Sequence, residues 1–269
     1  MALNSTQLSK AIYSILSVFA DELNTILQDN PASVCLYGSC ALGDFREGWS
    51  DIDFIALTDR PLSRKDAEKI LELRQRLVEK YGNPLFRSLE GVILSHGALL
   101  NDRKEPIIYW GTSGQRITDR FHFDSIGKKS LREHGIMICG EDFREDIPKP
   151  AYGQLYADVL RHCETIRKYA GTTGAQIYSF GWLLDIARCI YTLRTGEIIA
   201  KTAAGEWALQ NNICPEREVM ETTVAVRKNP LKYLQDESIL KAAANLGLDI
   251  QRFADVLEAE LRRKARCLG

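Results

Sequence analysis

The apolar positions of the chain follow two periods, and the change from one to the other divides the sequence. In the first part, short apolar runs such as Val34–Tyr37 and Ile52–Leu57 alternate with longer segments whose apolar residues recur at helical spacing. The short runs predict strands and the longer segments predict helices. In chain order we expect a helix at 6–29, strands at 34–37 and 50–57, a helix at 64–80, a strand at 88–95, a helix at 119–134 and a short buried run at 135–140.

One stretch of this first part has no clear period. Residues 97–118 contain Gly, Asn, Asp, Pro and Thr around Ile107–Gly111, which predicts an irregular insertion with one short strand. Loops of this length are often functional. Trp110 within it could stack on a base or a substrate ring, or it could be an aromatic residue of the core.

The pattern becomes entirely helical after Ile147-Pro-Lys-Pro150, which we interpret as a linker. The expected helices are 152–170, 175–195, 200–211, 216–229 and 238–266. Alternating strands and helices followed by helices alone predict an α/β (α+β) domain with a mixed sheet at 1–150 and an all-α helical bundle domain at 151–269.

Composition and charge narrow the possible functions. The chain has 269 residues and a net charge of −1, without the basic excess that proteins gripping long nucleic acid usually show. The seven cysteines form no Cys-x-x-Cys pair, which favours reduced thiols in a cytoplasmic protein. No apolar run approaches the ~18 residues that span a membrane, and no signal peptide is evident. We therefore expect a cytoplasmic monomer that binds neither long nucleic acid nor membranes.

Candidate chemistry concentrates between the first two expected strands. Gly38 permits a tight turn, and Ser39 follows at an expected helix N-terminus, where free N–H groups and the helix dipole favour a phosphate. Asp51 and Asp53 lie two apart on the next strand, so their carboxylates point to the same face. Two adjacent like charges repel unless a cation lies between them, and Mg²⁺ prefers carboxylate and phosphate oxygens.

The combined pattern Gly-Ser-x10-Ser-Asp-x-Asp resembles the DNA polymerase β-type nucleotidyltransferase superfamily. In that superfamily a third carboxylate arrives from a neighbouring strand. The resemblance assigns this role to Glu90, the only acid between Glu79 and Asp102. The alternative is that Glu90 is a charged residue on a sheet edge.

A second motif lies in the helical part, where Arg188 and Lys201 flank a turn at Gly196. By composition alone these could be surface charges near helix ends. The spacing Arg-x2-Tyr-x3-Thr-Gly-x-Ile-x2-Lys-x2-Ala-x2-Trp-Ala, however, is similar to the C-terminal domain of aminoglycoside adenylyltransferases of the streptomycin/spectinomycin type. The resemblance implies that Arg188 and Lys201 contact the ATP phosphates.

The same resemblance implies roles for the first motif and leaves the acceptor open. Asp51, Asp53 and Glu90 would hold Mg²⁺, with Glu90 as the base, and Gly38 and Ser39 would hold outer phosphates. The family places acidic side chains before the Arg to bind a cationic drug, whereas residues 174–180 contain no Asp or Glu and only Asp185 is nearby.

The sequence therefore predicts an Mg²⁺-dependent enzyme that moves AMP from ATP to a hydroxyl of a small molecule. An aminoglycoside is the leading acceptor. The alternatives are another antibiotic or a metabolite as acceptor, or a nucleotide-binding regulatory or antitoxin-like module without turnover.

Overall fold

The computed structural model describes residues 5–101, 103–119 and 121–268. Its internal contacts divide the chain into two compact units. The sheet unit consists of residues 1–42 and 51–149, and the helical unit consists of residues 43–50 and 150–269. The sequence predicted a single domain boundary, at residue 150. The structure differs in that Gly43–Ser50 packs with the helical unit, although it lies inside the first motif.

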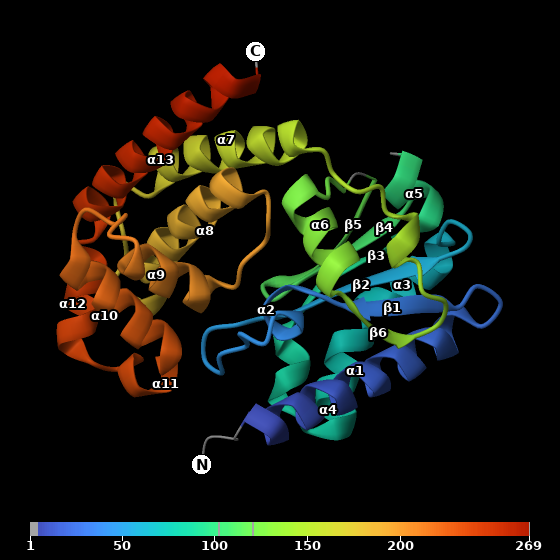
Figure 1. Cartoon of the computed structure of the whole chain (residues 1–269). Coiled ribbons are helices and arrows are strands. Elements are labelled where there is room, and N and C mark those ends of the chain that lie inside the picture. The colour runs from blue at the N-terminus through green and yellow to red at the C-terminus, as the bar shows by residue number, and fades with distance from the viewer. Residues whose placement is uncertain (1–4, 102, 120, 269) are drawn as a thin grey trace. The chain divides into compact units, whose positions relative to one another are not determined.

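The sheet unit is built on a six-stranded mixed sheet with the strand order β5-β4-β3-β2-β1-β6 (Figure 1). β2 and β3 pair in parallel and every other neighbouring pair is antiparallel. The strands are β1 (Ala32–Leu36), β2 (Ile52–Thr58), β3 (Leu89–Ser95), β4 (Ile107–Gly111), β5 (Gly114–Thr118) and β6 (Ile136–Cys139).

One face of the sheet packs on the long helix α1 (Ser5–Leu27), as Figure 1 shows. Phe19 of α1 is fully buried and meets Phe54 of β2 and Trp110 of β4 at ring-centroid distances of 4.6 and 5.2 Å. Trp110 has no exposed surface, so it is a core aromatic and its stacking on a substrate is excluded in this structure. The large area buried by these rings anchors the helix to the sheet.

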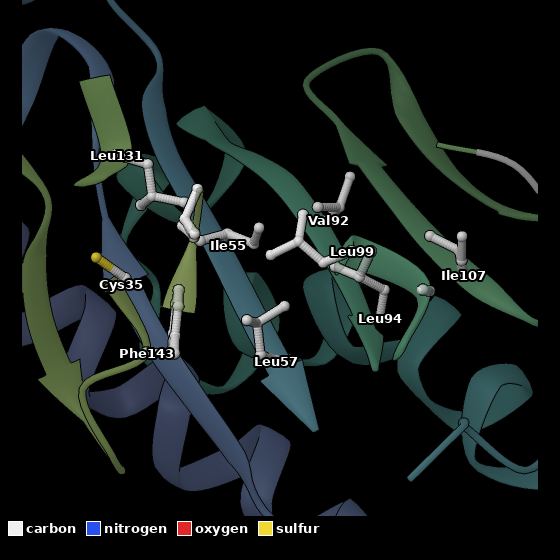
Figure 2. Close-up of a cluster of buried hydrophobic side chains, with 11 residues drawn as sticks. Cys35, Ile55, Leu57, Val92, Leu94, Leu99, Ile107, Leu131 and Phe143 are labelled. Atoms are coloured by element: carbon white, nitrogen blue, oxygen red, sulfur yellow. The ribbon is translucent and has the colours of Figure 1, made fainter. Parts of the chain in front are cut away.

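The opposite face carries a second apolar cluster, shown in Figure 2. Ile55 and Leu57 of β2 and Val92 and Leu94 of β3 pack there against Leu131, Phe143 and neighbouring side chains. Because side chains alternate along a strand, the residues two positions before Ile55 and Val92 share this face. Those residues are Asp53 and Glu90, so the carboxylates stand where the apolar cluster ends.

The remaining elements of the sheet unit correct several expectations. The expected helix at 64–80 is two helices, α3 (Arg64–Leu71) and α4 (Leu73–Tyr81). The buried stripe Ile70, Leu73 and Leu77 continues across the break, so the periodicity gave no sign of it. The expected N-cap is confirmed, since the Ser63 side chain accepts a hydrogen bond from the Asp66 N–H.

Two more corrections concern residues 97–134, of which 102 and 120 lie outside the described residues. The insertion contains the helix α5 (His96–Asn101) and the two strands β4 and β5, whereas one short strand was expected. The helix expected at 119–134 is α6 (Ser125–His134). It begins later because Asp124 caps it, accepting a 2.7 Å hydrogen bond from the Gly127 N–H. Short elements complete the unit, namely α2 (Gly38–Ala41), η1 (Pro84–Ser88) and η2 (Arg144–Asp146).

The helical unit follows the expected order with three differences. Its elements are α7 (Tyr152–Tyr169), η3 (Ile177–Phe180), α8 (Gly181–Thr195), α9 (Lys201–Gln210), α10 (Arg217–Lys228), α11 (Pro230–Tyr233), α12 (Glu237–Ala244) and α13 (Gly247–Leu268). The helix expected at 175–195 begins with a 3-10 turn, and the short α11 was not expected. The helix expected at 238–266 is divided before Gly247, whose Cα lies against the Gly171 carbonyl where a side chain would collide.

The predicted fold class is confirmed: a mixed-sheet α/β (α+β) unit is combined with an all-α unit. Among the described residues, no helix is long and apolar enough to cross a membrane. The six cysteines whose side chains are described are all free thiols.

Candidate active site

The turn after β1 is fixed against the strand that follows it. Gly38 has φ +66°, and a side chain there would collide with the carboxylate of Asp53. The Tyr37 N–H donates a 3.0 Å hydrogen bond to the Asp53 carbonyl oxygen. Glycine is therefore required at position 38 both for its backbone conformation and for the close approach of the carboxylate.

The sheet brings the predicted carboxylates together. Asp53 lies opposite Glu90 in the parallel register of β2 and β3, and Asp51 directly precedes β2. Burial raises the pKa of Tyr37, and the nearby Asp53 and Glu90 raise it further. Burial also raises the pKa of Tyr109, with contributions from Glu90 and Asp51. Asp53 and Glu90 therefore share one face of the sheet, whereas Asp51 lies just before β2 and not within the strand as expected.

The donor chemistry of this cluster fits a hard cation. Among the described residues, no three His, Cys, Asp or Glu side chains converge closely enough to hold a metal ion by themselves. Mg²⁺ usually takes one or two carboxylates and completes its shell with water and phosphate oxygens, so the pair Asp51 and Asp53 meets its requirement. The Ser39 hydroxyl, which follows the turn at Gly38, is buried without a hydrogen-bond partner among the described residues.

Tyr109 belongs to the site, although the sequence interpretation did not select it. Its hydroxyl donates a 3.0 Å hydrogen bond to Oε1 of Glu90, and the Arg116 guanidinium lies 4.0 Å from its ring centroid. Because side chains alternate along a strand, Tyr109 and Trp110 within Ile107–Gly111 point to opposite faces of the sheet. Once β4 pairs with β3 at Val92, Tyr109 must share the face of Glu90.

The helical unit brings the two predicted cations together through a carboxylate. Lys201 Nζ lies 3.1 Å from Oδ1 of Asp185, and Arg188 Nη1 lies 3.5 Å from the same oxygen. Burial opposes ionisation of Asp185, but Lys201 and Arg188 outweigh it and lower the pKa of this carboxyl. Each of the three side chains remains about one-third exposed, so a ligand can reach them. Asp185, considered above as a charge for the acceptor, is thus paired within the helical unit.

The turn that joins the two cations is tightly specified. Gly196 ends α8 in the left-handed conformation with φ +76°, as expected for a C′ glycine. The Thr192 hydroxyl donates a 2.9 Å hydrogen bond to the Glu197 carbonyl, and the Tyr191 ring packs edge-on to Trp207. Arg188 and Lys201 therefore extend from helices whose connection is held by side-chain contacts.

The segment before α8 offers few polar groups. Ile177, Ser179 and Phe180 are buried, whereas Gln176 and Tyr178 are exposed. The Tyr178 hydroxyl donates a 3.1 Å hydrogen bond to the Gly48 carbonyl. The exposed side chains Gln176 and Tyr178 of this segment therefore offer an amide and an aromatic ring, and the segment contains no carboxylate.

Two family models match the chain in succession. The nucleotidyltransferase domain matches residues 16–86, which contain the turn and the Asp51/Asp53 pair. The aminoglycoside adenylyltransferase C-terminal domain matches residues 153–246, which contain Arg188 and Lys201.

One curated relative and one solved structure are similar to the chain. A putative protein adenylyltransferase of Methanocaldococcus jannaschii is 36% identical over 70 residues, or 26% of this chain and 70% of the relative. The crystal structure of spectinomycin adenyltransferase AAD(9) from Enterococcus faecialis, solved with ATP and spectinomycin, superimposes with a TM-score of 0.67. That match covers 91% of this chain and 99% of the other at 17% identity, so it shows a shared fold.

Proposed function

Because the chain belongs to the nucleotidyltransferase superfamily and carries the C-terminal domain of the aminoglycoside adenylyltransferases, we propose that it transfers AMP from ATP to a hydroxyl of a small acceptor. The observation that carries the proposal is the pairing of Asp53 with Glu90 on adjacent parallel strands, with Gly38 packed against Asp53. One carboxylate pair for a metal and one further carboxylate for a proton are the groups that this transfer needs.

Each residue has a defined role in the proposed reaction. Gly38 and Ser39 bind outer phosphate oxygens, and Asp51 and Asp53 are the residues that would hold Mg²⁺. When bound, Mg²⁺ neutralises charge on the triphosphate oxygens and orients them. Phosphoryl transfer depends mainly on such positioning and charge stabilisation.

Glu90 takes the proton of the acceptor hydroxyl. The hydroxyl oxygen of the acceptor bonds to the α-phosphorus of ATP, and pyrophosphate leaves. Oε1 of Glu90 already accepts the hydrogen bond from Tyr109, which leaves Oε2 for the acceptor. Arg188 and Lys201 bind triphosphate oxygens, exchanging part of their pairing with Asp185 for the more highly charged ligand.

An aminoglycoside is the leading acceptor, in keeping with the C-terminal domain. A specific observation favours an acceptor that is less cationic than streptomycin. Residues 174–180 supply no carboxylate, and Asp185 is engaged by two cations. Ammonium and guanidinium groups bind best to carboxylates, through charge-assisted hydrogen bonds. The exposed Gln176 and Tyr178 suit a more neutral molecule.

The test is the release of pyrophosphate from ATP in the presence of Mg²⁺ and a panel of acceptors that includes streptomycin, spectinomycin and a lincosamide. Acceptor-dependent release supports the proposed transfer, and its absence with every acceptor despite ATP binding contradicts it. Efficient turnover of streptomycin, with kcat/KM of ~10⁴ M⁻¹s⁻¹ or above, would contradict the preference for a less cationic acceptor.

A further inference from the structure

A buried ionic cluster in the helical unit was not anticipated from the sequence. Asp44 and Arg227 are 3% and 1% exposed, and Thr202 beside them is 5% exposed. Charged side chains are rarely buried so completely unless they are paired. Neither Asp44 nor Arg227 can touch a bound nucleotide at this depth. Any effect they have on binding must therefore act through the residues that they contact.

The carboxylate of Asp44 is satisfied from several directions. Oδ2 accepts a 3.0 Å hydrogen bond from the Thr202 N–H, and Oδ1 accepts one of 2.6 Å from the Thr202 hydroxyl. Arg46 donates to Oδ1 at 3.1 Å, and Arg227 Nη2 donates to the Asp44 carbonyl at 3.0 Å. Burial opposes ionisation, but Thr202 and Arg227 outweigh it and lower the pKa of Asp44.

The contacts to Thr202 place this carboxylate at the start of α9. The helix begins at Lys201, and its N-cap residue Ala200 has no side chain that could accept a hydrogen bond. Asp44 therefore supplies from another segment the acceptor that Ser, Thr, Asp or Asn usually provides at an N-cap. Its negative charge also interacts favourably with the helix dipole there. The start of α9, and with it the backbone next to Lys201, is thereby fixed by a residue 158 positions before Thr202 in the chain.

The other side of the cluster holds the segment Gly43–Ser50. Arg227 Nη2 donates to the Ser50 hydroxyl at 3.1 Å, and the guanidinium lies 5.3 Å from the Trp49 ring centroid. The segment closes on itself through the Ser50 N–H, which donates to the Arg46 carbonyl at 2.8 Å. Ser50 directly precedes Asp51 in the chain, where the helical unit ends and the sheet unit resumes.

We propose that Asp44 and Arg227 are positioning residues for nucleotide binding, because together they hold Lys201 at the start of α9 and Ser50 next to Asp51. The proposal rests on the proposed function in one respect: Lys201 must bind the nucleotide. It predicts that losing the pair weakens ATP binding without removing any group that touches ATP.

The experiment replaces both members of the pair at once. Replacing Asp44 alone would leave Arg227 buried without a carboxylate and could unfold the protein, whereas the double variant Asp44→Asn with Arg227→Met leaves neither charge. The matched control is Glu258→Gln with Arg167→Met. This pair also lies in the helical unit, between α7 and α13, with Arg167 Nε 2.6 Å from Oε1 of Glu258. Melting temperature, the dissociation constant for ATP with Mg²⁺, KM and kcat are measured for both variants, for the parent and for Lys201→Ala.

We expect the Asp44/Arg227 variant to remain folded and to raise the dissociation constant and KM for ATP by about 10-fold, the scale of one charge-assisted hydrogen bond. Its kcat should stay close to that of the parent, since only binding is weakened. The control variant should match the parent in ATP affinity, even if its melting temperature falls by a similar amount.

The outcomes separate this proposal from the function on which it rests. If Lys201→Ala weakens ATP binding and the Asp44/Arg227 variant does not, the positioning role is wrong and the proposed function stands. An equal loss of ATP affinity in the control variant would also overturn it, because the effect would follow from general destabilisation. If the parent does not bind ATP, or Lys201→Ala leaves its affinity unchanged, the assignment of Lys201 fails and the positioning role fails with it.

Discussion

The two groups of candidate residues are held in place by different means. In the sheet unit, Asp53 and Glu90 occupy opposed positions in a parallel strand pair, and Gly38 is fixed by backbone conformation. In the helical unit, Lys201 and Arg188 are held by a shared carboxylate, and the helix that carries Lys201 is capped by a residue from another segment.

This difference has a consequence for what mutations can do. Strand register is set by the hydrophobic pattern of a whole sheet, so a side-chain substitution at Asp53 or Glu90 changes chemistry while the geometry persists. Ion pairs fix geometry through the side chains themselves, so substitutions in the helical unit change position and charge together. We therefore expect substitutions in the sheet unit to cause large losses of turnover. Substitutions in the helical unit should weaken ATP binding by smaller, graded amounts.

The largest expected effect follows from Glu90→Gln. This nearly isosteric change should lower turnover ~100- to 10,000-fold, the usual contribution of a general base, while ATP binding persists. Pyrophosphate release and equilibrium ATP binding measure the two quantities. Glu79→Gln, on the exposed face of α4, is the matched control and should behave like the parent. Turnover of Glu90→Gln within a few-fold of the parent would show that the base lies elsewhere.

The next effect concerns the metal ligands. With MgATP at 100 times its dissociation constant, binding adds ~2.7 kcal/mol to the stability of the folded state. The melting temperature of the parent should therefore rise with MgATP, and that of Asp51→Asn or Asp53→Asn should not. Asp59→Asn, at an exposed position just past the other end of β2, should retain the rise. A rise of equal size in the two metal-ligand variants would refute their assignment.

A smaller, graded effect should follow from Lys201→Ala or Arg188→Ala. A hydrogen bond to a charged group contributes ~1.5–3 kcal/mol, so each variant should bind ATP roughly 10- to 100-fold more weakly. The affinity for Mg²⁺ alone should not change, because the proposed metal ligands Asp51 and Asp53 belong to the sheet unit. Lys241→Ala, exposed on α12, controls for the loss of one positive charge. Unchanged ATP affinity in both variants would mean that the cations serve only Asp185.

The smallest effect should follow from Tyr109→Phe, which removes only the hydroxyl that bonds Glu90. Water can replace a phenol that is not fully buried, so the loss should be ~1 kcal/mol, or roughly 5-fold in turnover. ATP affinity should be unchanged. A loss as large as that of Glu90→Gln would indicate that Tyr109 itself handles the proton.

The sequence predicted the sheet site better than the helical one for a physical reason. The turn at Gly38 and the pair Asp51 and Asp53 lie within 16 consecutive residues, and strand alternation is a local property. Glu90 was selected through the family resemblance, and its place beside Asp53 rested on the assumption that the next strand lies beside β2, which the parallel register confirms. Tyr109 was missed because its partner strand could not be known before the hairpin of β4 and β5 was seen.

In the helical unit, local periodicity predicted the helices but not their contacts. The pairing of Asp185 with Lys201 spans 16 residues and crosses a turn whose shape depends on Gly196 and Thr192. The contact between Asp44 and Arg227 spans 183 residues. No periodic signal in either segment indicates it, because Arg227 alone is an ordinary charge in a helix and Asp44 alone is an ordinary charge in a loop.

The membership of Gly43–Ser50 in the helical unit has a consequence for the order of folding. A ribosome adds residues at ~5–20 per second, so Asp44 exists for ~10–40 s before Arg227 is made. During this time the segment between the turn at Gly38 and the strand at Ile52 has none of its partners from the helical unit. The turn at Gly38 and β2 can therefore pack together early, but the connection between them reaches its final form only when α9 and α10 have been synthesised. The first motif is therefore completed only after the helical unit has been made. A gene fragment that ends near residue 150 would encode this motif without the helices on which Gly43–Ser50 packs.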